Sequence, residues 1–336
     1  MRESKRIEWI DMAKGYGMIC VIIGHLQELP GLIAYVYTFH MPLFFFLSGY
    51  VLKTNMSFYE FLKRKIKGIL IPYFGLGIPA LLFFIAGHIY KNDLIIADSL
   101  KVFFSFLIQR RWGTIWFLAC LFWLNIFFYL LVNFILDERI LGIVVIILTL
   151  AGLIYYRLGG RPLVWNIDVC FTALPFFYMG YTLKNIKKLR EILFYSKYKN
   201  LILGFCIILN PVAGFLSWLI AGEGLEMANC LYGVEVLVYA SAFSGIVYML
   251  ALSRKFTLRI IQYIGENSLI YLAWHQTIMI PFIKELCEKC NIFQWENPTV
   301  IQSVIKIIIY LVLIIVPLTI ANLIIRKTPL RVIIGK

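Results

Sequence analysis

Charged side chains are scarce in this sequence. Asp, Glu, Lys and Arg make up 15% of its 336 residues, against about 25% in a typical soluble domain, whereas 61% of the residues are hydrophobic. Apolar runs recur along the whole chain, and no long polar segment remains from which a soluble domain could be built. The shortage of charge therefore argues against an ordinary soluble protein. It predicts an all-α, polytopic membrane protein folded as a single helical domain over residues 1–336.

Several signatures of secreted proteins and soluble enzymes are missing as well. No small-residue cleavage site follows the first apolar run, so we expect that run to stay as a membrane anchor. The absence of GxSxG and HExxH motifs leaves a serine triad or a zinc peptidase without support. Among seven cysteines, Cys287 and Cys290 form one CxxC, which is half of a zinc site or a possible disulfide. No second pair accompanies it, and we expect no metal.

The apolar runs have the length that a membrane span requires, which is about 20 residues. Ten of them qualify, although Pro175 interrupts the sixth. They are residues 9–28, 34–53, 68–89, 114–136, 140–157, 168–184, 200–220, 231–252, 265–284 and 301–325. The stretch 94–108 is too short and too charged to span, and we expect an interfacial or re-entrant helix there.

Lys and Arg are distributed unequally over the predicted loops. With ten spans both termini lie on one side, and that side collects 22 of the 32 basic residues, against 9 on the other. Because basic loops favour the cytoplasm, we expect both termini to be cytoplasmic in a cell (plasma or inner) membrane. The net charge of +14 is then explained by the topology of the chain in the membrane, with the lipid bilayer as its partner. It does not call for nucleic acid.

Ionisable side chains occur in the first two predicted spans. Burying such side chains in hydrocarbon is costly, so where they occur they often belong to a functional site. Lys14 and His25 are eleven residues apart, about 20° past three full helical turns, so they share one face about 16 Å apart in height. Asp11 lies on the same face and can pair with Lys14. This face is therefore expected to point into the bundle, and we take Asp11 as a candidate for substrate binding.

His40 lies in the second span, which runs the opposite way, at a depth similar to that of His25. Two histidines from adjacent antiparallel helices can meet there. A neutral imidazole can take the proton of a hydroxyl that attacks a thioester. The alternative is that each histidine only hydrogen-bonds a neighbouring helix.

Six short blocks follow one another in the order seen in the acyltransferase 3 superfamily, from Arg6 to Gln276. They are RIEWIDMAKGYGMICVIIGH, FHMPLFFFLSGY, KRKIKGILIPYF, GTIWFLACLF, LPFFYMGYTLKN and YIGENSLIYLAWHQ. The chain therefore resembles this superfamily, and within it the branch of the fucose 4-O-acetylase-related proteins. Members are integral membrane enzymes that carry an acyl group, usually acetyl, from cytoplasmic acyl-CoA to a sugar of a surface or secreted glycan.

The resemblance implies roles for residues of the first two spans. His25 matches the catalytic base, and Lys14 matches a basic group near the entry path of the donor. Many members have arginine at that position, and lysine lacks its bidentate fork. His40 matches the histidine of the FHMP block and ranks second to His25.

The basic block before the third span is the candidate site for acetyl-CoA. Arg64 and Lys67 are expected to meet the phosphates of the donor, with Tyr73 in the same block. The alternative is that this loop contacts anionic lipid, as basic inside loops do.

Three further residues are candidates for binding the acceptor. Trp116 is a cavity wall or an interfacial aromatic residue, and Asp168 hydrogen-bonds sugar hydroxyls or lies on the surface. His275 lines the acceptor side of a pore or bridges two helices.

The sequence thus predicts a membrane O-acyltransferase that moves acetyl from acetyl-CoA to a hydroxyl of a glycan or lipid-linked sugar of a surface polysaccharide or exopolysaccharide. Direct transfer is the simplest mechanism, an acetyl-histidine intermediate stays open, and polysaccharide synthesis machinery is a further partner to consider. One alternative is a transporter or flippase without covalent chemistry, for which internal repeats would be usual and none is found. Another is an acyltransferase for a small amino acid or antibiotic sugar. The sugar, the acyl chain and the oligomeric state stay open.

Overall fold

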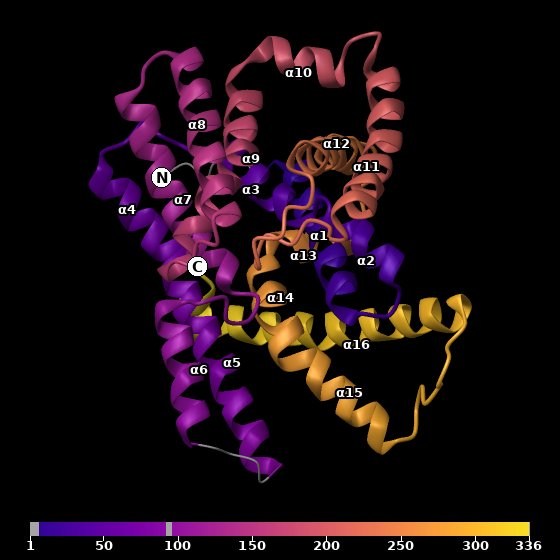
Figure 1. Ribbon diagram of the computed structural model, residues 1–336. Helices are drawn as coiled ribbons and strands as arrows, with labels where there is room; N and C mark the ends of the chain where they lie inside the picture. The colour runs from indigo at the N-terminus through magenta and orange to yellow at the C-terminus, as the bar shows by residue number, and fades with distance from the viewer. Residues whose placement is uncertain (1–6, 92–95, 336) are drawn as a thin grey trace. The chain divides into compact units, whose positions relative to one another are not determined.

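The computed structural model describes residues 7–91 and 96–335, and over these residues the chain is helical (Figure 1). One isolated β-bridge joins Glu226 and Leu231. The α-helices are α1 (Glu8–Leu26), α2 (Pro30–Tyr37), α3 (His40–Tyr50), α4 (Phe58–Lys65), α5 (Ile71–Tyr90), α6 (Ile96–Ile108), α7 (Trp116–Phe134), α8 (Glu138–Arg157), α9 (Ile167–Asn185), α10 (Lys187–Phe194), α11 (Lys199–Ala221), α12 (Glu235–Lys255), α13 (Arg259–Glu266), α14 (Ser268–Trp274), α15 (Ile280–Lys289) and α16 (Val300–Lys327). The π-helical turns η1 (Ile66–Leu70) and η3 (His275–Met279) and the 3₁₀ turns η2 (Val164–Asn166) and η4 (Pro329–Ile334) complete them. The predicted all-α fold is confirmed.

Seven helical segments of the described residues are long and apolar enough to cross a membrane. They are Pro30–Tyr50, Phe58–Tyr90, Trp116–Phe134, Glu138–Arg157, Lys199–Ala221, Glu235–Lys255 and Val300–Lys327. The other three predicted spans are helical too, in α1, in α9 and around η3. The chain is therefore a multi-pass membrane protein. The number of ten spans and the cytoplasmic side of the termini stay predictions.

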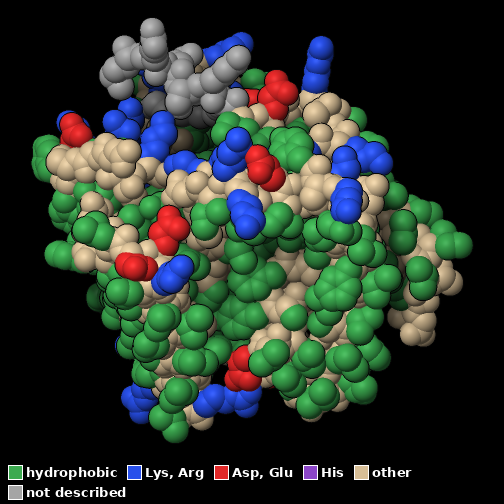
Figure 2. Space-filling model, turned by 90° about the horizontal axis from the view of Figure 1, so that it is seen from above, with side chains coloured by type: hydrophobic (Ala, Val, Ile, Leu, Met, Phe, Trp, Pro, Cys, Tyr) green, Lys and Arg blue, Asp and Glu red, His purple; other side chains and the backbone are tan. Residues whose placement is uncertain are grey.

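The outer faces of these helices are apolar. On α16 the exposed side chains include Ile301, Ile305, Ile308 and Val312, spaced three or four residues apart along one face. On the side drawn in Figure 2, hydrophobic side chains cover a broad area, and Lys and Arg gather toward its margins. A soluble protein rarely exposes so long a row of large apolar side chains on one helix, whereas lipid tails suit it.

The helices form two compact units, each built from separate parts of the chain. Unit 1 contains Met1–Val51, Met179–Met227 and Leu231–Ser268, and unit 2 contains Leu52–Tyr178, Ala228–Cys230 and Leu269–Lys336. This grouping does not test the prediction of a single domain, which stays a prediction.

In unit 1, glycine lets two helices approach to backbone contact. A Cβ atom at Gly15 of α1 would meet the carbonyl oxygen of Ile261 in α13, and one at Gly265 of α13 would meet the carbonyl oxygen of Asp11. Small residues allow such close packing of helices in membranes. The helix α1, which carries Asp11, Lys14 and His25, therefore packs closely against α13 because each of the two helices has a glycine at the contact.

The predicted second span is broken near its middle. α2 ends at Tyr37 and α3 begins at His40, and Phe39 between them has φ −138° and ψ −16°. Gly214 of α11 and Gly245 of α12 leave the room that Thr38 and Phe39 occupy. Because a broken helix loses some of its i to i−4 hydrogen bonds, carbonyl groups near the break become available to other donors.

In unit 2, two loops hold non-glycine residues with positive φ angles. Gln109 (46°) and Arg111 (59°) lie between α6 and α7, and Trp165 (58°) and Asn166 (53°) lie before α9. Such backbone angles are unfavourable for residues with a Cβ atom and persist where the surroundings hold them. Arg111 of the first loop contacts Asp168 in the first turn of α9, directly after the second loop.

Candidate functional site

In unit 1, His25 and His40 lie against one aromatic ring. The Tyr37 ring meets that of His25 edge to face with centroids 6.3 Å apart, and that of His40 with centroids 4.8 Å apart. His25 comes from the last turn of α1 and His40 from the first residue of α3. His40 is buried and His25 is half-buried. We call His25, Tyr37 and His40 the histidine cluster.

The hydrogen bond of His40 fixes which of its ring nitrogens carries hydrogen. Its Nδ1 lies 2.8 Å from the carbonyl oxygen of Val36, on the other side of the break. A carbonyl oxygen can only accept, so Nδ1 must donate. A neutral imidazole has one N–H, and the lone pair is therefore on Nε2. Within the described part of the chain no hydrogen bond is made to Nε2. His40 is thus set up to accept a proton or a hydrogen bond at Nε2.

Lys14 and Asp11 form an ion pair on α1. Lys14 Nζ lies 3.9 Å from Asp11 Oδ1, and the side chains are 29% and 8% exposed. Lys14 is about 16 Å along the helix axis from His25. That separation is too long for contact between the two side chains, so a role for Lys14 in the reaction requires a substrate long enough to reach both.

The break that places His40 is tied to two neighbouring helices. Asn210 of α11 is fully buried, and its Nδ2 lies 2.9 Å from Thr38 Oγ1, 2.7 Å from the carbonyl oxygen of Ser241 and 3.1 Å from Ser241 Oγ. Thr38 Oγ1 donates to the carbonyl oxygen of Tyr35, 2.7 Å away. Beside them, the hydroxyls of Tyr35 and Tyr248 are 2.7 Å apart. The α2–α3 junction is thus held by side chains of α11 and α12.

In unit 2, Asp168 is buried and paired. Its Oδ2 lies 2.5 Å from Arg111 Nη2, and it also accepts from the Tyr156 hydroxyl. Arg111 Nη2 lies 2.9 Å from the Tyr156 hydroxyl and 3.0 Å from Cys230 Sγ. Burial acts to lower the pKa of the Arg111 guanidinium, but Cys230, Tyr156 and Asp168 together hold that pKa above its ordinary value. We call these four residues the Arg111 cluster. The alternative of a surface aspartate is wrong, because Asp168 is 1% exposed.

Three acceptor or donor atoms near this cluster are buried without a hydrogen-bond partner in the described residues. They are Asp168 Oδ1, Asn166 Oδ1 and Arg111 Nε. Buried polar atoms of this kind ordinarily find a partner in the protein or in a bound molecule. The Arg111 cluster therefore has hydrogen-bonding capacity left over.

Tyr73 and Trp116 belong to the same part of unit 2. The Tyr73 hydroxyl donates to the carbonyl oxygen of Phe106 and accepts from Gln109 Nε2 at 3.0 Å, and its ring packs on Trp165 with centroids 5.1 Å apart. Trp116 is buried, and its carbonyl oxygen accepts from Asn166 Nδ2 at 3.3 Å. Tyr73 therefore joins the aromatic residues beside the two loops, and its predicted role in binding the donor stays a prediction.

His275 is fully buried in unit 2 at the first residue of η3. Its Nδ1 lies 2.7 Å from the carbonyl oxygen of Tyr271 and 3.1 Å from that of Leu272. Nδ1 is therefore the protonated nitrogen, as in His40. A π-helical turn is often found at functional positions of a helix, which keeps His275 among the candidates.

Arg64 and Lys67 are both exposed, at the end of α4 and in η1. This position leaves them accessible to a ligand or to lipid headgroups. Within the described part of the chain, neither makes a hydrogen bond or an ion pair with another predicted site residue.

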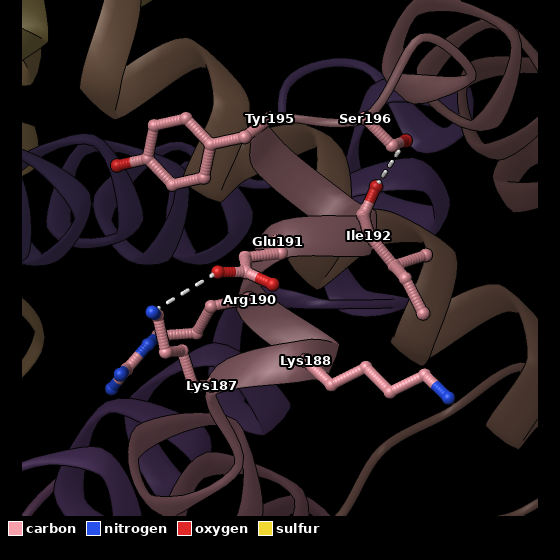
Figure 3. Close-up of a pocket in the computed structure, with 7 residues that line it drawn as sticks. All are labelled: Lys187, Lys188, Arg190, Glu191, Ile192, Tyr195 and Ser196. Atoms are coloured by element: carbon pink, nitrogen blue, oxygen red, sulfur yellow. Dashed lines mark hydrogen bonds and ion pairs between the residues drawn. The ribbon is translucent and has the colours of Figure 1, made fainter.

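A surface pocket of about 590 Å³ lies along α10 in unit 1 (Figure 3). It is lined by Lys187, Lys188, Arg190, Glu191, Ile192, Tyr195 and Ser196. Lys187 pairs with Glu191 at 3.6 Å, and Arg190 donates to the carbonyl oxygen of Lys184. None of the predicted catalytic residues lines it, and we assign no chemistry to it.

The cysteines are free thiols. Cys287 is buried and Cys290 is exposed, and Cys120 Sγ lies 3.6 Å from Cys170 Sγ. Among the residues that the structure describes, no group of three or more His, Cys, Asp or Glu side chains is arranged to hold a metal ion.

The predicted site residues thus divide between the units. Asp11, Lys14, His25 and His40 belong to unit 1, and the other predicted residues, Arg64, Lys67, Tyr73, Trp116, Asp168 and His275, belong to unit 2. Sequence reasoning missed Tyr37, Asn210 and Arg111. Asn210 carried a signal, because an amide in the middle of an apolar span is costly unless it is bonded. Arg111 carried none, because its partners lie far along the chain. Tyr37 carried none either, because its contacts with the two histidines are between rings and leave no pattern in the sequence.

The chain matches the model of a family described as an acyltransferase domain over residues 7–326. No curated protein and no solved structure matches the chain.

Proposed function

The chain belongs to the acyltransferase 3 superfamily and is a membrane acyltransferase, and on this premise we propose that it transfers acetyl from cytoplasmic acetyl-CoA to a sugar hydroxyl of a surface polysaccharide or exopolysaccharide. The observation that carries the proposal is the histidine cluster, in which two imidazoles in the apolar unit 1 meet at Tyr37. When a hydroxyl attacks a thioester, a base must take the hydroxyl proton, and a neutral imidazole can serve as that base.

In the proposed reaction His25 is the base. It takes the proton of the acceptor hydroxyl as the oxygen attacks the thioester carbonyl carbon, and a C–O bond forms while the C–S bond breaks. CoA leaves as a thiolate, which recovers the proton from the His25 imidazolium. His40 accepts a hydrogen bond at Nε2 from a neighbouring hydroxyl of the same sugar and so orients the acceptor.

The donor side of the proposal uses the basic residues. Lys14, about three turns from His25 on α1, is positioned to meet a remote part of a long donor such as acetyl-CoA. Arg64 and Lys67 are exposed cations that suit its phosphates. We propose that acetyl-CoA binds from the cytoplasmic side of the cell (inner or plasma) membrane, because the distribution of basic loops favours that side for both termini.

The acceptor side of the proposal uses unit 2. Asp168 and Asn166 have buried oxygen atoms without a partner in the described residues, and Trp116, Trp165 and Tyr73 supply aromatic rings beside them. Sugars are bound by this combination, because their hydroxyls need acceptors and their C–H faces stack on rings. Within unit 2 by itself, we propose that this group of residues, together with His275, contacts a sugar of the glycan or lipid-linked acceptor.

The proposal is tested with purified protein in lipid nanodiscs. Radiolabelled acetyl-CoA and host glycan are supplied, and label in the glycan is compared for wild type, His25→Ala and, as a control, His88→Ala. We expect labelling by wild type and His88→Ala, and a loss of about 10²-fold or more in His25→Ala, as for removal of a general base. Labelling that persists in His25→Ala would refute His25 as the base. If wild type turns over no acetyl-CoA with any glycan, a transporter without covalent chemistry is favoured.

A further inference from the structure

We propose that Asn210 is a positioning residue of this acyltransferase, which acts through Thr38 to hold the break between α2 and α3 that orients His40. The inference rests on the proposed function for its kinetic consequence. Its structural consequence, the orientation and hydrogen placement of His40, stands without it.

The contacts of Asn210 are directional. Ser241 Oγ donates to the carbonyl oxygen of Asn210 at 2.7 Å, and Thr38 Oγ1 donates to the carbonyl oxygen of Tyr35 at 2.7 Å. Both hydroxyl hydrogens are therefore in use, and both hydroxyl oxygens present lone pairs to Asn210 Nδ2. The amide group of Asn210 fits because it supplies two hydrogens at one atom.

The position of Thr38 is what matters for the site. Thr38 and Phe39 interrupt the helix between Val36 and His40. These two residues are four positions apart, and in a continuous helix they would share a backbone hydrogen bond. With the break in place, the Val36 carbonyl oxygen accepts from His40 Nδ1. That oxygen also accepts from the backbone N–H of Phe39 at 3.4 Å. If the break healed into a continuous helix, the backbone N–H of residue 40 would approach the same oxygen, and the Nδ1 hydrogen would have to share it in a changed geometry.

Asn210 fixes Thr38 to both α11 and α12, since its Nδ2 also bonds Ser241. The neighbouring Gly214 and Gly245 supply room for Thr38 and Phe39 but no hydrogen bond. The polar restraint on the junction from α11 therefore comes from Asn210. Loss of this restraint is expected to act on His40 before it acts on the donor side, because Lys14 lies on α1.

Four variants test the inference. Asn210→Ala removes the donor, Thr38→Val removes its acceptor while keeping the shape, and Thr38→Ser keeps the hydroxyl. Ser253→Ala is the matched control, because Ser253 is equally buried on α12 but its hydroxyl bonds only within its own helix, to Met249. Thermal unfolding in detergent checks that each variant is folded.

Two measurements are made on each variant. The first is ¹⁵N NMR of histidine-labelled protein, with the His40 signals assigned by their loss in His40→Gln. The second is steady-state kinetics with acetyl-CoA and glycan. We expect wild type, Thr38→Ser and Ser253→Ala to show His40 with hydrogen on Nδ1. Asn210→Ala and Thr38→Val should show a mixture of tautomers and lose about tenfold or more in kcat, with KM for acetyl-CoA within about twofold of wild type.

Three results would overturn the inference. One is an unchanged His40 spectrum in folded Asn210→Ala and Thr38→Val. Another is a changed spectrum with unchanged kcat, which separates the junction from the reaction. The third is a loss in Thr38→Ser as large as in Thr38→Val, which shows that the hydroxyl is not what matters. Should wild type itself lack turnover, the proposed function fails while the NMR comparison still decides whether Asn210 positions His40.

Discussion

The Nδ1 hydrogen of His40 is donated to the carbonyl oxygen of Val36, 2.8 Å away across the break between α2 and α3. This one contact ties the chemistry of the ring to the local backbone. Because Nδ1 is occupied, Nε2 is the nitrogen left to accept from a substrate. The following predictions concern this contact and the packing that surrounds it.

The ring of Tyr37, rather than its hydroxyl, is expected to hold the histidine cluster together. Tyr37→Phe keeps the edge-to-face contacts with His25 and His40, so kcat should stay within about twofold of wild type, whereas Tyr37→Leu removes contacts worth about 1 kcal/mol each and should lower kcat about tenfold. Steady-state kinetics with acetyl-CoA and glycan decide this. An equal loss in both variants would show that the hydroxyl is required.

The ion pair between Arg111 and Asp168 is expected to be structurally important. Asp168→Asn leaves the Arg111 guanidinium, only 12% exposed, without its counter-charge, and should cost about 3 kcal/mol of stability. The matched control is Asp98→Asn, which breaks the exposed pair with Lys101 and should change stability by about 0.5 kcal/mol or less. Thermal or denaturant unfolding in detergent measures both. Similar values for the two variants would contradict the assignment of a buried pair.

Gly265 is expected to tolerate no larger residue. In Gly265→Ala the new methyl group meets the backbone of Asp11, and α1 must move away from α13, at a cost of about 1–3 kcal/mol. Gly204→Ala in α11 is the control, since nothing lies near its Cβ position and alanine should stabilise that helix by about 0.5–1 kcal/mol. Unfolding curves are expected to shift in opposite directions. A stable Gly265→Ala protein would contradict the close packing of α1 on α13.

The exposed basic block is expected to contribute to donor binding. Replacing Arg64 and Lys67 together by alanine should raise KM for acetyl-CoA about three- to tenfold, as for the loss of one or two polar contacts, with little change in kcat. Replacing Lys187 and Lys188 removes the same charge from α10 and should leave KM unchanged. If both double variants behave alike, general electrostatic attraction or lipid contact explains the block instead.

Much of the fold could be predicted from hydropathy. The scarcity of charge and the ten apolar runs predicted an all-α membrane bundle, and helices are present at every one of those runs. The order of the six sequence blocks predicted the superfamily, and the family match over residues 7–326 confirms it. Both results depend on properties of single residues or short blocks, which the sequence displays directly.

The details of the predicted spans were less accessible. The span predicted at 34–53 is two helices, α2 and α3, and the one at 265–284 contains the π-helical turn η3. Neither Thr38 nor Phe39 is a strong helix breaker in sequence. The break exists because Gly214, Gly245 and Asn210, far along the chain, provide space and hydrogen bonds for it.

The sequence by itself predicted that His25 and His40 lie at similar depths in a membrane bundle, since helical rise and hydropathy set the expected depth of a residue. Only the tertiary structure decided that both rings meet at Tyr37, that His40 carries its hydrogen on Nδ1, and that Asp168 is buried against Arg111. The physical reason is that depth follows from the local chain. The partner of a buried polar group is chosen by whichever distant segment supplies a donor or acceptor at that point.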